Sequence, residues 1–258
     1  MLIVKIQGGL GNQMFQYAAG LSLADKRRDD LVIDVSSFMH DPIRSFRLDL
    51  FPGVARRLAS GDVSVLGPTT RVPTPVRVVR DDFRTFSFPE GDLYLDGYWQ
   101  SERFFADIAD KIIGDFDLSH LSARVPADAH RCAALHVRRG DYLRSNGYHP
   151  VLGADYYRGA LSLLDDFDGV KVFSDDPDWC AQGLGVEGAQ VVAGNDEITD
   201  LGIMSRCRHN VIANSSFSWW AAWLNRTPGR MVVAPTKWFG PTAGLNTDNM
   251  VPSGWHVL

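Results

Sequence analysis

Short apolar runs alternate with amphipathic stretches along the whole chain, and this alternation predicts strands and helices in turn. Residues 40–92 contain six prolines and are expected to form loops and short elements on the first sheet. A strand, a loop, a helix and a second strand in succession are typical of a parallel sheet. In the first half we expect strands at residues 2–6, 31–34 and 93–96, and helices at residues 13–28 and 102–113.

The second half repeats the pattern, with strands expected at residues 132–136, 170–173, 190–192, 210–213 and 231–234, and helices at 155–164, 197–207 and 219–225. A polar stretch from Asp117 to Asp128, which contains Pro126, is the expected linker. The predicted fold is therefore α/β, with two facing Rossmann-type parallel-sheet domains and a cleft between them. We expect these domains at residues 1–125 and 126–258.

Composition and charge narrow the class of protein. A hydrophobic fraction of 45% and a charged fraction of 22% are ordinary for a soluble globular protein. The net charge of −5 argues against a general nucleic-acid binder, so an anion site would have to be a local cluster. Cys132, Cys180 and Cys207 lack metal-ligand spacing and favour a reduced, cytosolic protein. The apolar N-terminus is too short for a signal peptide, and no segment is expected to span a membrane.

The motif His136-Val-Arg-Arg-Gly-Asp-Tyr142 directly follows an apolar run that predicts a buried strand. Open α/β sheets bind ligands at the carboxyl edge, where such a motif lies. Arg138 and Arg139 offer forks suited to a bidentate grip on phosphate, and Gly140 lets the backbone turn closely. The alternative is a surface turn with solvated arginines.

Two later strands also end in polar residues, Ser174-Asp-Asp176 and Asn214-Ser-Ser-Phe-Ser218. The amides and hydroxyls of the serines open a helix, where the dipole favours phosphate. The carboxylate of Asp175 suits two hydrogen bonds from a purine edge such as that of guanine. Ordinary helix capping would explain the serines alone, but the three strand ends together predict a pocket for a nucleotide diphosphate.

The first half contributes two further candidate turns. The glycine-rich turn Gly8-Gly-Leu-Gly-Asn12 offers free amides at a helix start, although it lacks the spacing of a dinucleotide fingerprint and could be only a tight turn. In the turn Gly97-Tyr-Trp-Gln-Ser-Glu102, aromatic faces suit pyranose rings and the Gln100 amide suits hydroxyls, with simple core packing as the alternative. Ser101 is expected to cap the following helix.

Metal binding is not expected. Asp115-Phe-Asp117 and Asp176-Pro-Asp178 match an Asp-x-Asp pattern that often holds Mg²⁺ or Mn²⁺ beside a nucleotide sugar. Two arginines are already available to neutralise a diphosphate, so the chemistry does not require a metal. The histidines are scattered, and no Ser-His-Asp, Cys-His or zinc pattern has a persuasive context.

Five linked motifs resemble glycosyltransferase family 11, the α-1,2-fucosyltransferases of bacteria and animals. The resemblance runs from Gly8 to Trp238 in the family's order, and the stretch 54–89 carries none of the motifs and is where acceptor choice could diverge. The motifs are Gly8-Gly-Leu-Gly-Asn-Gln-Met-Phe-Gln-Tyr-Ala18, Gly97-Tyr-Trp-Gln-Ser-Glu102, His136-Val-Arg-Arg-Gly-Asp-Tyr142, Phe173-Ser-Asp-Asp176 and Asn214-Ser-Ser-Phe-Ser-Trp-Trp-Ala-Ala-Trp-Leu224.

The resemblance implies a GT-B fold and metal-independent, inverting transfer of fucose from GDP-β-L-fucose to the 2-hydroxyl of a terminal galactose, with no cofactor. It also implies that Arg138 binds the β-phosphate, that His136 lies against the nucleoside and that Asp175 lies near guanine. We expect Arg138 to be the main catalytic group, and Arg139 and Asp141 to hold the loop in shape. The catalytic base is left open among Asp34, Glu102 and Asp141.

The full set of expected site residues has three parts. For catalysis these are Arg138 and Asp141. For the acceptor they are Trp99, Gln100 and Glu102. For the donor they are His136, Arg138, Arg139, Ser174, Asp175, Asn214, Ser215, Ser216 and Phe217 from the second domain, and Gly9, Gly11 and Asn12 from the first.

The expected partners are GDP-fucose and a galactose-terminated surface glycan, and no nucleic acid. A bacterial, cytoplasmic enzyme is expected, with peripheral membrane association if the acceptor is lipid-linked. Two rival functions stay open. One is a glycosyltransferase that uses another nucleotide sugar or another acceptor hydroxyl, and the other is a non-catalytic sugar or nucleotide binder.

Overall fold

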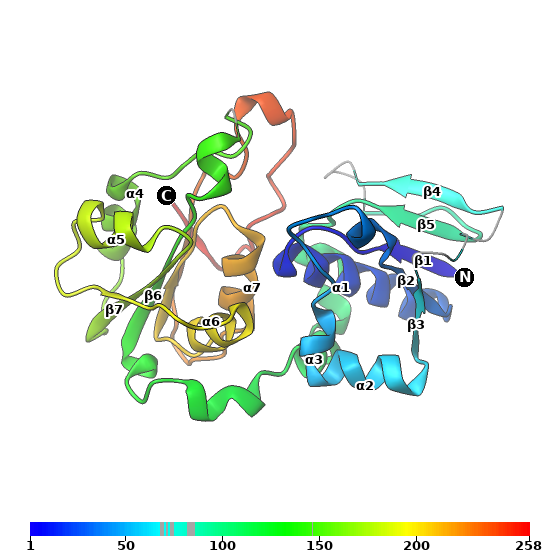
Figure 1. The fold of residues 1–258 in the computed structure, drawn as a ribbon, viewed down its shortest axis with the longest axis horizontal. Helices are drawn as coiled ribbons and strands as arrows, with labels where there is room; N and C mark the ends of the chain where they lie inside the picture. Colours follow the sequence, from blue (N-terminus) through cyan, green and yellow to red (C-terminus); the bar gives the residue numbers. More distant parts are fainter. Residues whose placement is uncertain (68–69, 71, 73–74, 82–85, 146) are drawn as a thin grey trace. The chain divides into compact units, whose positions relative to one another are not determined.

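The computed structural model of the chain describes residues 1–67, 70, 72, 75–81, 86–145 and 147–258. The chain forms two compact units, and each is an α/β unit built on one parallel sheet (Figure 1). Unit 1 comprises Met1–Leu118 and Asp248–Met250, and unit 2 comprises Ser119–Thr247 and Val251–Leu258. The prediction of two parallel-sheet α/β units is confirmed. The division falls at Leu118 rather than near residue 125, because part of the expected linker forms a 3₁₀ helix, Ser119–Arg124, that packs on unit 2.

The sheet of unit 1 has five strands in the order β3-β2-β1-β5-β4, all paired in parallel. The central strand is buried on both faces, since Leu2, Ile3 and Val4 are fully buried, and this is why it appears in the sequence as a continuous apolar run. The strands are β1 (Leu2–Lys5), β2 (Leu31–Asp34), β3 (Val63–Leu66), β4 (Arg77–Arg80) and β5 (Leu93–Asp96).

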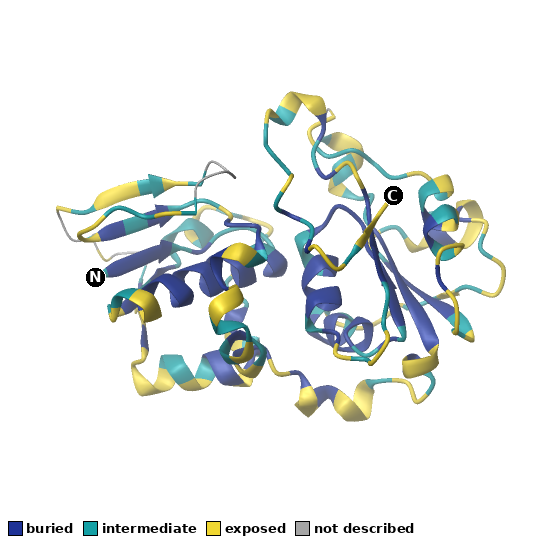
Figure 2. Cartoon of the chain, turned by 180° about the vertical axis from the view of Figure 1, so that it is seen from behind, coloured by how far each residue is buried: buried dark blue, intermediate teal, exposed yellow. Residues whose placement is uncertain are grey.

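The helices of unit 1 are α1 (Leu10–Arg27), α2 (Pro52–Ser60) and α3 (Ala109–Asp115), with 3₁₀ helices at Ser36–Met39, Leu48–Leu50, Glu102–Phe104 and Ala106–Ile108. The stretch expected to hold only loops and short elements contains α2, β3 and β4. The edge strand β4 is largely exposed and shows no alternation (Figure 2), so its pattern gave no signal. The single helix expected at 102–113 is broken into two 3₁₀ turns and the short α3, although Ser101 accepts from the Arg103 amide as predicted.

A buried carboxylate connects the helices α1, α2 and α3 of unit 1. Asp115 on α3 accepts a hydrogen bond from the Tyr17 hydroxyl of α1 at 2.9 Å, and from Nε of Arg57 on α2 at 2.7 Å. Burial, and next the nearby Asp115, raise the pKa of Tyr17. Asp115 therefore has a structural role, although it begins one of the two Asp-x-Asp pairs. A Cβ added to Gly53 would lie 2.5 Å from the Asp115 Cα, so α2 can approach α3 only with glycine there.

Replacing Gly53 with alanine should lower the free energy of unfolding by about 1–3 kcal/mol, because the added methyl group meets backbone atoms that cannot rotate away. The matched control is Gly114→Ala on α3, where a Cβ would meet nothing within 4 Å. That change should be neutral or stabilising by up to about 1 kcal/mol, since alanine is the better helix former. Urea unfolding of both variants measures the difference, and equal stabilities would contradict this account of the contact.

The sheet of unit 2 has six strands in the order β11-β10-β9-β6-β7-β8, again all parallel. Every residue of the central β6 is buried. The strands are β6 (Cys132–Val137), β7 (Gly169–Ser174), β8 (Gln190–Val191), β9 (His209–Val211), β10 (Val232–Ala234) and β11 (His256–Val257), and the helices are α4 (Ala154–Leu161), α5 (Pro177–Gly183), α6 (Glu197–Met204) and α7 (Ser216–Leu224). Short 3₁₀ helices lie at Ala129–Arg131, Asp141–Arg144 and Pro241–Ala243.

The strand order of unit 2 creates a topological switch point. From β6 the chain runs through α4 to β7 on one side, whereas β9 lies on the other side of β6 and leads through α7 to β10. The loops after β6 and β9 therefore leave in opposite directions from adjacent strand ends. Ligands of open α/β sheets bind at such a point. No helix in the part of the chain that the structure describes is long and apolar enough to cross a membrane.

Candidate functional site

Arg138 follows β6 and is held from two sides. Its Nε lies 3.1 Å from Oδ2 of Asp175, which follows β7, and its Nη2 lies 2.8 Å from Oδ1 of Asp141. Its guanidinium carbon also lies 5.5 Å from the centroid of the Tyr142 ring. A guanidinium carries five N–H donors, and these two ion pairs engage two of its nitrogens. The fork is thus oriented, with donor capacity left over for an anion.

The Asp175 carboxylate organises the whole loop after β6. Its Oδ1 accepts a hydrogen bond from the Arg139 backbone amide at 2.9 Å, while its Oδ2 meets Arg138. A Cβ on Gly140 would lie 2.6 Å from the same Oδ2, so the loop can wrap around the carboxylate only with glycine at this position. Both carboxylate oxygens are engaged with the loop. The contact with guanine that was expected for Asp175 stays a prediction.

Arg139 points to a different partner from Arg138. Its Nε lies 3.0 Å from Oδ2 of Asp176, and its guanidinium carbon lies 4.0 Å from the centroid of the Trp179 ring. The contact with Arg139 is the main reason why the pKa of Asp176 is lowered. Asp176 also caps α5 by accepting from the Trp179 amide, and its own amide donates to Ser174 Oγ. Arg139 therefore connects the loop after β6 with the loop after β7. The second Asp-x-Asp pair, Asp176-Pro-Asp178, begins with the N-cap residue of α5.

The loop after β9 brings a helix N-terminus to the same edge. Asn214 is buried, and its Nδ2 donates to the carbonyls of Pro150 and Trp238 at 3.0 and 3.1 Å. The Tyr142 hydroxyl donates to the Asn214 carbonyl at 2.8 Å, which joins the loops after β6 and β9. Ser215 is the N-cap residue of α7, and its side chain makes no capping hydrogen bond. The first amides of a helix have no intrahelical partner, so α7 directs donors to this edge.

Buried polar atoms at this edge that have no hydrogen-bond partner among the described residues include Nδ1 of His136 and Oδ1 of Asn214. The His136 ring lies 5.7 Å from the Phe217 ring, centroid to centroid. Burial, and next the Arg138 charge, lower the pKa of His136 to about 3, so its imidazole is neutral near pH 7. Buried polar groups are nearly always hydrogen-bonded, so two unpaired ones at a switch point fit a site completed by a ligand.

His149 contacts the loop that carries Arg138, and the sequence did not predict this contact. Its ring stacks on that of Tyr142 with centroids 4.3 Å apart and an angle of 9°. Burial is the largest of the effects that lower the pKa of His149. Together with the ring of Phe239, 5.4 Å from His149, the stack backs the loop that carries Arg138. His149 follows no motif, and a stack between residues seven positions apart in a loop has no periodic signal.

In unit 1, two buried glutamines of α1 shape the glycine-rich turn. Gln13 Nε2 donates to the carbonyls of Gly8 and Ser45 at 2.9 and 2.8 Å. Gln16 Oε1 accepts from the Gln7 amide, and its Nε2 donates to the Gly97 carbonyl at 3.1 Å. Gly9 is the N-cap residue of α1, and Gly11 and Asn12 lie in its first turn. The glutamines occupy polar positions of the helix pattern, so the sequence suggested no role for them.

The predicted acceptor residues follow β5, next to β1. Gln100 Nε2 donates to Asn12 Oδ1 at 2.7 Å, which joins the turns after these two strands. Trp99 is only 2% exposed and meets Phe104 edge-on at 5.4 Å, so its ring belongs to the core. Glu102 begins the 3₁₀ helix Glu102–Phe104. Among the candidate catalytic bases, Asp34 accepts two hydrogen bonds, from the Tyr94 hydroxyl at 2.6 Å and from the Ser36 amide at 2.9 Å.

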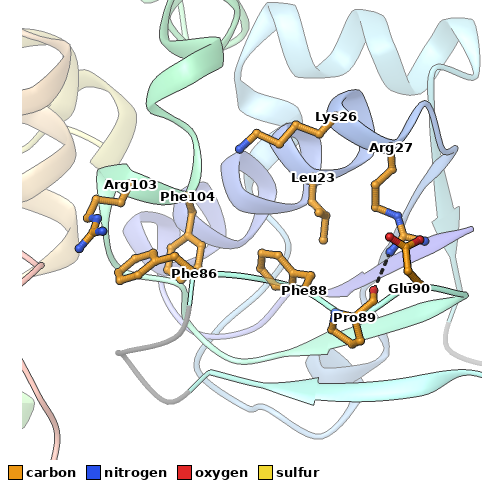
Figure 3. A pocket seen from close by; sticks show the side chains of 9 residues that line it. All are labelled: Leu23, Lys26, Arg27, Phe86, Phe88, Pro89, Glu90, Arg103 and Phe104. Atoms are coloured by element: carbon orange, nitrogen blue, oxygen red, sulfur yellow. Dashed lines mark hydrogen bonds between the residues drawn. The ribbon is translucent and has the colours of Figure 1, made fainter.

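A cavity of about 210 Å³ lies elsewhere in unit 1, between α1 and the segment that precedes β5 (Figure 3). Its aromatic walls include Phe86 and Phe104, and its cations are engaged. The Arg103 guanidinium carbon lies 4.2 Å from the Phe86 ring centroid, and Arg27 donates to the Pro89 carbonyl at 3.2 Å. None of the predicted site residues lines this cavity, so it is separate from the strand-end clusters. Within the described ranges, no group of three or more His, Cys, Asp or Glu side chains is arranged to hold a metal ion.

Comparison with known protein families agrees with this geometry. The model of glycosyl transferase family 11 matches residues 1–255. The chain belongs to glycosyl transferase family 11. The resemblance drawn from the five motifs is thereby confirmed, and the protein is an enzyme that transfers glycosyl groups.

Two relatives of this family 11 enzyme are bacterial glycosyltransferases. The chain is 31% identical to the O-antigen biosynthesis glycosyltransferase WbnK of Escherichia coli, over 97% of this chain and 98% of the relative. It is 29% identical to an alpha-1,2-colitosyltransferase of Escherichia coli, over 99% and 98% of the two chains. Both are similar to this family 11 enzyme over nearly their whole length.

The fold of the enzyme is similar to that of a solved fucosyltransferase. A crystal structure of NodZ from Bradyrhizobium superposes with a TM-score of 0.52 at 17% identity and covers 85% of this chain and 91% of NodZ. NodZ has also been solved after soaking with GDP-fucose, as an alpha-1,6-fucosyltransferase, and that structure gives a TM-score of 0.51. The likeness confirms the predicted GT-B-like fold class.

The neutral, buried His136 of the enzyme predicts a pH dependence of stability. The unfolded chain takes up a proton at this residue as the pH falls below about 6.5, whereas the folded chain resists until about pH 3. Stability contributed by the neutral ring is thus present above pH 6.5 and lost as the pH falls. His136→Gln should lose about 2 kcal/mol less unfolding free energy than the parent between about pH 7 and pH 4.5.

Chemical denaturation at the two pH values measures this difference. His120→Gln, at an exposed position of the same unit, should keep the full parental loss. A His136→Gln variant whose stability falls as steeply as that of the parent would show that the residue is protonated in the folded state.

Proposed function

We propose that the enzyme transfers L-fucose from GDP-β-L-fucose to the 2-hydroxyl of a terminal galactose, with inversion and without a metal. The observation that carries this proposal is the cluster at the β6–β9 switch point. There an oriented arginine fork, the N-terminus of α7 and the unpaired buried polar atoms of His136 and Asn214 lie at the ends of β6 and β9, whose loops are joined by Tyr142. This set suits the diphosphate and the nucleoside of a GDP sugar.

The chemistry is a direct displacement at C1 of fucose. The bond from C1 to the phosphate oxygen breaks as the bond to the galactose oxygen forms. The proton of the galactose 2-hydroxyl passes to a general base, and the departing GDP gains negative charge. Arg138 and the first amides of α7 would stabilise that charge as it develops, because they are already oriented before the reaction. Asp141, which pairs with Arg138, acts through the arginine and is a positioning residue in this mechanism.

The nearly full-length likeness to a colitosyltransferase supports a second candidate, the α-1,2 transfer of colitose. Colitose differs from fucose by the absence of one ring hydroxyl, so both sugars would present the same GDP to the cluster around Arg138. The likeness to an O-antigen enzyme supports a surface glycan as acceptor. The enzyme is then expected in the bacterial cytoplasm, at the inner face of the membrane if the acceptor is lipid-linked.

Arg138→Lys should reduce the transfer rate about 10²–10³-fold, since a single ammonium cannot replace an oriented fork aimed at the leaving group. Initial rates with GDP-fucose and a β-galactoside measure the loss. Arg131→Lys is the matched control, because Arg131 pairs with Asp168 on the surface of the same unit, and it should keep the parental rate. Parental turnover in Arg138→Lys would refute the assigned role.

The donor is tested by ranking GDP, UDP and dTDP in a thermal-shift assay and then supplying GDP-fucose or GDP-colitose with a β-galactoside. GDP should raise the melting temperature most, and NMR of the product should show fucose α-1,2-linked to galactose. Activity should persist in EDTA. Preferential stabilisation by UDP or dTDP would point to another donor. Binding without transfer from any donor would favour a non-catalytic protein.

A further inference from the structure

The turn that follows β5 is held in a strained conformation. Trp99 has a φ of 55°, in the left-handed region that bulky residues rarely adopt. Its backbone amide donates to Asp81 Oδ2 at 2.7 Å, and the Gly97 carbonyl accepts from buried Gln16. A Cβ on Gly97 would lie 2.3 Å from the Asp81 Cβ, so Asp81 fits against the turn only because residue 97 is glycine. Such strain persists where surrounding contacts impose it, and it gathers at functional sites.

Gln100 lies in this strained turn, and only one of the two polar atoms of its side chain has a hydrogen-bond partner among the residues that the structure describes. Gln100 is 8% exposed, and its Nε2 donates to Asn12 Oδ1 at 2.7 Å. Its Oε1 is buried and has no hydrogen-bond partner in the ranges that the structure covers. A buried amide oxygen without a partner costs about 1–3 kcal/mol, so a fold that imposes this arrangement implies a donor that arrives with a ligand.

The Asn12–Gln100 amide pair lies at the switch point of unit 1. The strands β1 and β5 are neighbours, and the chain leads from β1 to β2 on one side, while β4 flanks β5 on the other. Asn12 lies in the first turn of α1, after β1, and Gln100 follows β5. The pair itself carries no charge. Neutral amides that offer both donors and acceptors suit sugar hydroxyls, which also donate and accept.

We propose that Asn12 and Gln100 form a hydroxyl-reading pair for the acceptor sugar, in which Gln100 Oε1 accepts from a ring hydroxyl of galactose. Asn12 thus belongs to the acceptor, not to the donor as its glycine-rich motif led us to expect. Asp81 is the positioning residue, since it fixes the Trp99 amide and with it the direction of Gln100. The identity of the sugar as galactose rests on the proposed function.

The direct test is a thermodynamic cycle that combines the substitution Gln100→Leu with the removal of single hydroxyls from the acceptor. Lactose and its analogues lacking the 3-, 4- or 6-hydroxyl of galactose are assayed with the parent and the variant. One deoxy analogue should raise the parental KM about tenfold or more, because it leaves the amide unpaired. In Gln100→Leu, lactose itself should show that higher KM and the same analogue should cost less than twofold more. The KM for GDP-fucose should stay within twofold in both proteins.

The control variant is Gln182→Leu, which removes an exposed amide from α5 and should leave both KM values at the parental level. Asp81→Ala should raise the KM for lactose about as much as Gln100→Leu does. Asp81→Asn should restore it, since the asparagine oxygen can still accept from the Trp99 amide. Melting temperatures are recorded for every variant. A purely structural role for Asp81 would lower the stability and affect both substrates together, with no selective rescue.

Three results would overturn the assignment. The first is a Gln100→Leu variant with a higher KM for GDP-fucose and an unchanged KM for lactose, which would return the amide pair to the donor. The second is an increase in KM for each deoxy analogue that is the same in the parent and in Gln100→Leu. The hydroxyls and Gln100 would then act independently of each other. The third is a parent that binds no galactoside, since the pair would then have no galactose to read.

Saturation-transfer NMR with lactose alone separates this proposal from the donor assignment. With this method, the binding of lactose and its deoxy analogues to the parent and to Gln100→Leu is compared without any nucleotide sugar. If lactose binds through Gln100 but no fucose is transferred, the proposed donor is wrong and the amide pair stands. If fucose is transferred and the cycle shows no coupling, the donor stands and the amide pair is wrong.

Discussion

The carboxylate of Asp175 is the contact on which the candidate site depends. It receives the Arg139 amide on one oxygen and Nε of Arg138 on the other, and Gly140 leaves the room for the loop to wrap around it. The Arg138 guanidinium lies over the ring of Tyr142, whose hydroxyl donates to the Asn214 carbonyl. The loop after β6 therefore also holds the loop after β9. A single acidic group between adjacent strands thus sets the geometry of three strand ends.

The two units use the same architecture with different chemistry. In unit 2, ion pairs and a helix N-terminus converge at the β6–β9 edge, which suits an anionic ligand. In unit 1, buried amides converge at the β1–β5 edge, where Gln16 and Gln100 connect the turns. Parallel strands bring their carboxyl ends together in both cases, so the residue types that follow each strand decide which ligand the edge favours.

The sequence predicted the central strands and the polar residues that follow them, because buried parallel strands are continuous apolar runs and their ends are adjacent by topology. It missed the strands β3, β4 and β11 and the helices α2 and α5. Of these, β4 is exposed at the edge of its sheet, and the start of α2 was marked only by Pro52 at its first position. The residues that hold the loops in place were not predictable from the sequence. Asp81, Gln13 and His149 act through contacts with loops that are distant or irregular, and such contacts leave no period in a single sequence.

The charge balance around Arg138 indicates how this edge would stabilise a leaving diphosphate. The ion pairs join two arginines, Arg138 and Arg139, to three aspartates, so the group as a whole carries a charge of −1. Net positive charge therefore cannot be what the loops offer. What they offer is direction, because the ion pairs orient the Arg138 fork and the fold aims the first amides of α7 before any substrate arrives. Donors that need no reorganisation stabilise developing charge even in a group that is acidic overall, and this is why the shape of the guanidinium matters more than its charge.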